Sequence, residues 1–133
     1  MYAPFLIGLL ALFPANTAAL TVSVPPETTP LELTSTTTIE AHVREVQDEY
    51  GLGRDFYDTL KCESMGWRNV QSHHPSARGP NGRENSWGVA QIHLPSHPEV
   101  TQEQALDVRF AVEWTAKAFV AGDKAMWTCW HGV

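Results

Sequence analysis

Apolar residues recur every three or four positions in three stretches of this chain, which is the spacing of one face of an α-helix. The first face consists of Ile39, Val43, Val46 and Tyr50. Thr37 followed by Glu40 fits a capping box at its start, and Gly51 ends it. We therefore expect the globular part of the chain to begin with a helix just after residue 37.

A second helix is predicted from about Arg54 to Glu63. Phe56 and Leu60 lie four residues apart and Glu63 follows three later, so an acid closes an apolar stripe. Gly66 and several polar residues come next. The helix should therefore end within about one turn of Glu63 and open into a long loop.

The last predicted helix begins near Thr101, where Gln104 completes a second capping box, and it ends at Gly122. Its apolar face consists of Leu106, Phe110, Trp114, Ala118 and Ala121. Between Ser64 and Ser86 no period persists, and a loop of this length is usually functional or contains a short hairpin. The predicted fold class is mostly α, with a long loop or small hairpin between the acid-bearing helix and the Gly-Val-Ala-Gln-Ile segment of residues 88–92.

The N-terminal part of the chain has the composition of a targeting segment followed by a tether. No charged side chain precedes Glu27, and the apolar run Phe5–Phe13 is followed by small residues up to Ala19. We interpret residues 1–19 as a secretory signal peptide, or as an uncleaved anchor because no basic residue precedes the run. Residues 20–37 are rich in Thr and Pro and read as a linker.

Residues 38–133 then form one domain, which we expect to be secreted, periplasmic or associated with the cell wall. The net charge of −6 argues against nucleic-acid binding through a basic surface and against a polybasic membrane contact. Membrane contact is expected only if the N-terminal segment stays uncleaved. Five tryptophans suit a cleft for ring-shaped ligands, although they also suit a core.

Cys62 and Cys129 are the only cysteines, and an even count in an exported chain suggests a disulfide. Two isolated cysteines lack the paired spacing of a metal site. The candidate histidine ligands lie in proline-containing loops and are interpreted as polar loop residues: His73, His74, His93 and His97. We therefore expect neither a metal nor a cofactor.

Glu63 is the strongest candidate for chemistry. A carboxyl set half into an apolar wall has a raised pKa and can hold a proton at neutral pH, as a general acid must. The alternative is a surface glutamate that happens to follow a cysteine.

Several of these residues together resemble a known family. They are Cys62-Glu63-Ser64, Trp67, Ser72, Gly88-Val89-Ala90-Gln91-Ile92 and the terminal Trp127-Thr128-Cys129. Over about residues 39–130 the chain resembles the lysozyme-like domain of soluble lytic transglycosylases, and its cysteine pair is similar to that of resuscitation-promoting factors. The resemblance implies a lysozyme-like fold in which Glu63 is the catalytic acid and Gln91 lines the sugar-binding cleft. It also implies that Ser64 and Ser72 support the acid or the substrate.

The chain departs from this family downstream, where it lacks an Ala-Tyr-Asn-Ala-Gly-like stretch. Trp127 and Trp130 are candidates to replace that cleft wall, and Trp87 and Trp127 are candidates to bind substrate. The alternative is a structural or adhesive domain in which these three tryptophans belong to the core.

Counting carboxylates separates the possible reactions. Retaining and inverting glycosidases use two, and Glu84 is the only acid in the long loop that could be the second. One acid suffices if the sugar's own N-acetyl group or 6-hydroxyl attacks, as the resemblance to lytic transglycosylases implies. We interpret the chain as a monomeric transglycosylase that cleaves the β-1,4 MurNAc–GlcNAc bond of peptidoglycan strands. A hydrolytic muramidase that uses Glu84 and a non-catalytic glycan-binding module are the alternatives.

Overall fold

The computed structural model describes residues 33–132. The predicted signal peptide or anchor and most of the predicted linker lie outside the described residues. The helices are α1 (Thr36–Glu49), α2 (Arg54–Glu63), α3 (Gln102–Leu106) and α4 (Val108–Ala121), and the strands are β1 (Ser86–Trp87) and β2 (Ile92–His93). Short 3-10 turns occupy Pro80–Gly82, Leu94–Ser96, Lys124–Met126 and Thr128–Gly132. The prediction of a mostly helical fold is confirmed, and none of the described helices could span a bilayer.

Helix α1 begins slightly earlier than the sequence pattern predicts. Ser35 is the N-cap: its hydroxyl accepts the Thr38 N–H, and the Thr38 side chain accepts the Ser35 N–H. The predicted capping box of Thr37 and Glu40 is therefore wrong, and residues 36 and 37 belong to the helix rather than to the linker. Glu40 instead accepts the hydroxyl of Tyr57 at 2.6 Å, which ties α1 to α2.

Helix α2 spans the predicted residues and ends at the acid. Phe56 and Leu60 are fully buried, while Glu63 at the end of the same stripe is only partly buried. Ser64 is the C-cap, and Gly66 follows with a φ of 83° that favours glycine. The apolar stripe thus anchors the helix and leaves its last side chain at the edge of the core.

The helix predicted from Thr101 to Gly122 is two helices, α3 and α4. Thr101 and Gln104 form the predicted capping box of α3. Asp107 then breaks the run, because its backbone is extended and its carboxylate accepts the Phe110 N–H as the N-cap of α4. Aspartate competes with the helical backbone for such hydrogen bonds, which explains the break inside a continuous apolar period.

Strands β1 and β2 form a short antiparallel hairpin in which Ser86 pairs with His93 and Trp87 with Ile92. The hairpin therefore encloses residues 88–91 instead of preceding them, and the loop before it folds back through isolated bridges. Gly88 is required at the turn: its φ is 80°, and a Cβ atom there would lie 1.8 Å from the carbonyl oxygen of Ala105.

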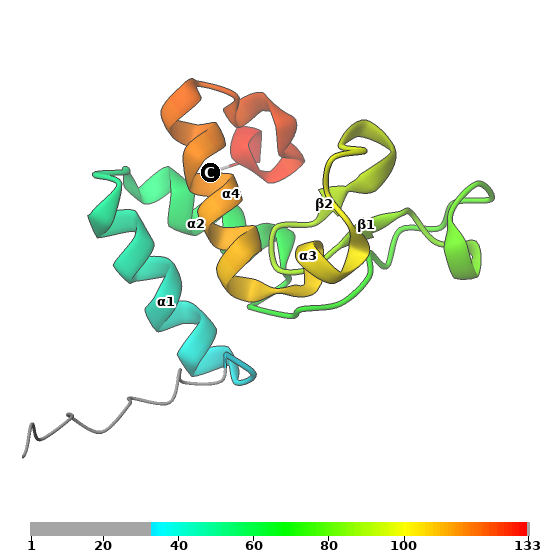
Figure 1. The fold of residues 1–133 in the computed structure, drawn as a ribbon, viewed down its shortest axis with the longest axis horizontal. Coiled ribbons are helices and arrows are strands. Elements are labelled where there is room, and N and C mark those ends of the chain that lie inside the picture. Colours follow the sequence, from blue (N-terminus) through cyan, green and yellow to red (C-terminus); the bar gives the residue numbers. More distant parts are fainter. Residues whose placement is uncertain (1–32, 133) are drawn as a thin grey trace, which may run out of the picture. The chain divides into compact units, whose positions relative to one another are not determined.

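The core lies between α1, α2 and α4, and the hairpin and the loop extend to one side of these helices (Figure 1). The C-terminal segment, red in Figure 1, returns to α4 and to the end of α2. Trp127 is 4% exposed, and its ring packs edge-on against Trp114 and at a tilt against Phe119, with ring centroids 6.0 and 5.4 Å away. This aromatic anchor brings the tail beside Glu63.

Candidate active site

The carboxylate of Glu63 lies in a cleft of about 390 Å³. The end of α2, the loop around residues 70–74, the hairpin and the tail around residues 126–129 form its walls. The predicted site residues that line it are Glu63, Ser64, Ser72, Glu84, Gln91, Trp127, Cys62 and Cys129. Trp87, predicted to bind substrate, lies outside this cleft and borders a second hollow beside it.

The surroundings of Glu63 raise its pKa. Burial of the carboxyl is the largest cause, and the negative charge of Glu84 adds to it. Backbone N–H groups of Cys129 and Thr128 and the nearby His74 act in the opposite direction without reversing the shift. Glu63 therefore keeps its proton to higher pH than an ordinary glutamate, which is the property a general acid needs.

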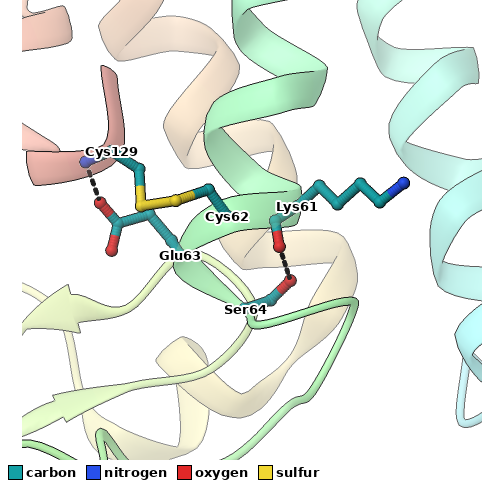
Figure 2. The surroundings of a disulfide bond; sticks show 5 residues. All are labelled: Lys61, Cys62, Glu63, Ser64 and Cys129. Carbon is teal, nitrogen blue, oxygen red and sulfur yellow. Dashed lines mark hydrogen bonds between the residues drawn. A yellow bond between two sulfur atoms is a disulfide. The ribbon is translucent and has the colours of Figure 1, made fainter. Parts of the chain in front are cut away.

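A disulfide joins Cys62 to Cys129 across 67 residues, as the cysteine count predicts. Next to it, the N–H of Cys129 donates to Oε1 of Glu63 at 2.9 Å (Figure 2). A salt bridge of 2.7 Å between Lys124 and Asp55 adds a further link between the tail and α2. The position of the acid and the position of the tail are thus fixed together.

Glu84 brings a second carboxylate into the same cleft. Its Oε1 accepts the hydroxyl of Ser86 at 3.1 Å, and its Oε2 accepts that of Ser72 at 3.4 Å. Its charge is close enough to Glu63 to raise that group's pKa. Both oxygens of Glu84 are therefore engaged by hydroxyl donors from the loop and from β1.

The two serines named by the resemblance have different surroundings. Ser72 bonds to Glu84 and also accepts the N–H of His74 at 3.2 Å. Ser64 accepts the Trp67 N–H at 2.7 Å and bonds to the carbonyl of Lys61, turned away from Glu63 (Figure 2). Ser64 therefore shapes the end of α2, whereas Ser72 holds the second carboxylate.

The tryptophans contribute mainly to the framework. The indole of Trp127 donates to the carbonyl of Ala90 at 2.8 Å, so this residue joins the tail to the hairpin while one side of it lines the cleft. The indole of Trp87 donates to Asn85 at 2.7 Å. Trp130, a candidate for the cleft wall, packs against the core and is not among the residues that line the cleft.

Gln91 lines the cleft with a left-handed backbone, at a φ of 47°. Its Nε2 atom donates to the carbonyls of Gly88 at 2.9 Å and Val70 at 3.1 Å. The side chain thus ties the hairpin turn to the facing loop.

We expect Gln91→Ala to lower the free energy of unfolding by about 1–3 kcal/mol, because two backbone carbonyls lose their donor. Turnover should fall as well, since the turn lines the cleft. Urea unfolding followed by an activity assay measures both effects, with the exposed Gln102→Ala as the matched control. A loss of turnover at unchanged unfolding free energy would instead assign the amide to the substrate.

Periodicity does not reveal the apolar rim of the cleft. Met65, Val70 and Met126 are 58%, 42% and 41% exposed, and all three line it. Among the described residues only one other large apolar side chain, Val120, is exposed. Exposed apolar groups gathered at one cleft indicate a surface for ligand binding.

Unusual backbone occurs at one of these rim residues and close to it. Met65 has a φ of 50°, and the buried Trp67, two residues on, has a φ of 74°. Non-glycine residues rarely occupy this region, and such strain tends to cluster at functional sites. Only the loop conformation could reveal either feature.

Within residues 33–132, no three His, Cys, Asp or Glu side chains lie close enough together to hold a metal ion. Comparison of the chain with protein-family models, with curated proteins and with solved structures finds no match.

Proposed function

We propose that this protein is a lytic transglycosylase with a lysozyme-like fold, in which Glu63 cleaves the β-1,4 bond between N-acetylmuramic acid and N-acetylglucosamine. The observation that carries the proposal is a carboxyl with a raised pKa in an open cleft with an apolar rim. The resemblance of the surrounding residues to lytic transglycosylases supplies the substrate class. Export to the cell wall belongs to the same proposal, and the disulfide is consistent with it.

The reaction needs one proton donor that later acts as a base. Glu63 gives its proton to the glycosidic oxygen as the bond from C1 of the muramic acid breaks. The 6-hydroxyl of the same sugar then attacks C1 and returns its proton to the Glu63 carboxylate. The products are a 1,6-anhydromuramoyl end and a free N-acetylglucosamine hydroxyl, and the acid is restored. No water is consumed.

The cleft walls suit this substrate. The apolar rim of Met65, Val70 and Met126 matches the flat faces of pyranose rings and the methyl groups of N-acetyl substituents. The N–H groups of the tail hold Glu63 in place without a charge pair. A purely structural domain would gain nothing from a half-buried acid and an exposed apolar rim at one cleft.

The presence of Glu84 in the cleft favours one second candidate, a hydrolytic muramidase. Such an enzyme would use Glu84 to activate water or to attack the sugar. Because each oxygen of Glu84 already accepts a serine hydroxyl, we favour Glu84 as a fixed negative charge that adds to the effect of burial in raising the pKa of Glu63.

Product chemistry separates these two reactions. We expect mass spectrometry of digested peptidoglycan to show 1,6-anhydromuramic ends from the wild type and from Glu84→Gln. The variant should keep most of its turnover at acidic pH. The alkaline limb of its pH–rate profile should move to lower pH, because one cause of the raised pKa of Glu63 is removed.

The control is Glu49→Gln, which makes the same change at the exposed end of α1 and should leave the profile unchanged. Reducing muramic ends in the wild-type digest, with Glu84→Gln as damaging as loss of Glu63, would establish the two-carboxylate hydrolase instead. Binding of glycan strands with no cleavage at any pH would favour the non-catalytic module.

A further inference from the structure

A second, more open hollow of about 580 Å³ adjoins the cleft of Glu63. Arg68, Val70, Gln71 and His73 line both. Arg83 and Trp87 line only the second. A ligand held in the cleft can therefore extend past residues 68–73 into this hollow.

The lining of this hollow contains two arginines, Arg68 and Arg83, and no carboxylate. This is unusual in a chain with a net charge of −6. Elsewhere four cations are each within 4 Å of a carboxylate: Arg44, Arg54, Lys117 and Lys124. Within residues 33–132, neither arginine of the hollow makes an ion pair.

The framework of the hollow is held rigid by one buried amide. Gln71 is 4% exposed, and its Nε2 donates to the carbonyls of Pro80 at 2.9 Å and Glu84 at 3.2 Å. Its oxygen accepts the side-chain amide of Asn81 at 3.2 Å. The loop that carries Arg83 is thus fixed to the segment around Gln71, three residues after Arg68, so the backbone that carries the two arginines is preorganised.

A guanidinium group without a partner is suited to a carboxylate, whose two oxygens match its fork of N–H donors. Trp87 adds an apolar surface at the same place. A neutral glycan strand offers these guanidinium groups hydroxyl and carbonyl oxygens but no anion to pair with. The anionic part of peptidoglycan nearest to the bond cleaved is the peptide attached to the lactyl group of muramic acid, which carries free carboxylates.

We propose that Arg68 and Arg83 bind a free carboxylate of this peptide while the glycan strand lies in the cleft of Glu63. The inference rests on the proposed function, because it takes the glycan as the ligand of the cleft. It makes the enzyme selective for peptide-bearing strands over bare ones.

The test is calorimetric titration with a GlcNAc–MurNAc disaccharide peptide, which lacks the bond to be cleaved. A second form of the ligand has its peptide carboxylates converted to carboxamides. We expect the wild type to bind the carboxylate form about tenfold tighter, as a charge-assisted hydrogen bond would give. The double variant Arg68→Gln/Arg83→Gln should bind both forms equally, at the affinity of the wild type for the carboxamide.

Arg78→Gln is the matched control, since Arg78 is exposed on the same loop and lines neither hollow; it should keep the full preference. Equal affinity of the wild type for both forms would overturn the inference, as would a preference that survives in the double variant. A third titration, with a phosphate-bearing wall polymer, tests the other anion of the wall. Tighter binding of that polymer than of the carboxylate peptide would also overturn the inference.

Catalysis is tested separately by the products of digestion, so the two proposals can fail independently. A wild type that prefers the carboxylate form but does not cleave strands would contradict the lytic function and support this binding site. A wild type that cleaves peptide-bearing and peptide-free strands with the same kcat/KM would contradict the binding site and support the lytic function.

Discussion

Glu63→Gln should lower the rate of glycan cleavage by roughly 10²–10⁴-fold, the usual contribution of general acid catalysis. Glutamine keeps the shape of the side chain, and its carbonyl oxygen can still accept the N–H of Cys129. It cannot give a proton to the leaving oxygen. The measurement is turnover on purified peptidoglycan at a pH where the wild type is most active.

Stability measurements on the same variant separate catalysis from folding. Burial raises the pKa of Glu63 in the folded protein, so the wild type loses stability as the pH rises from the unfolded-state pKa through the folded-state pKa. Glu63→Gln lacks this loss and should be at least as stable as the wild type above that window. A variant that melts much earlier than the wild type would show that Glu63 acts through folding, and unchanged turnover would show that it is not the acid.

How far the fold could be predicted depends on how local its determinants are. The bounds of α2 follow from Phe56, Leu60 and the glycine after the acid, and these are local signals. The predicted start of α1 is wrong because Ser and Thr fill residues 34–38, and several of these side chains could cap the helix. The break at Asp107 was missed because Leu106 and Phe110 continue the apolar period across it.

The candidate site likewise contains residues that local patterns identify and contacts that they do not. Glu63, Glu84 and the two cysteines can be selected from residue type, spacing and count. The hydrogen bond from the Cys129 N–H to Glu63 joins residues that are 66 positions apart in the sequence, and no local pattern encodes such a contact. The rim formed by Met65, Val70 and Met126 depends on loop backbone, and it was likewise not predicted.

Removing the disulfide with Cys62→Ser/Cys129→Ser should lower the free energy of unfolding by roughly 4 kcal/mol, the value expected for closing a loop of this length in the chain-entropy model. Activity should fall even where the domain remains folded. The core between the helices does not involve either sulfur, whereas the tail loses the covalent link that holds it beside Glu63. Urea unfolding and turnover in the same buffer measure the two effects.

The effect on activity follows from the contacts that remain. Without the bond, the salt bridge of Lys124 still holds the tail to α2, and Trp127 still holds it to α4 through its ring contacts and to the hairpin through its indole N–H. None of these contacts involves residue 129 itself, so the hydrogen bond from the Cys129 N–H to Glu63 should weaken and the acid should lose its fixed position against this wall of the cleft. A reductant should reproduce both losses in the wild type and leave the double variant unchanged, because the variant has no disulfide to break. A double variant that matches the wild type in urea midpoint and turnover would show that the contacts of Trp127 and Lys124 alone hold the tail against the acid.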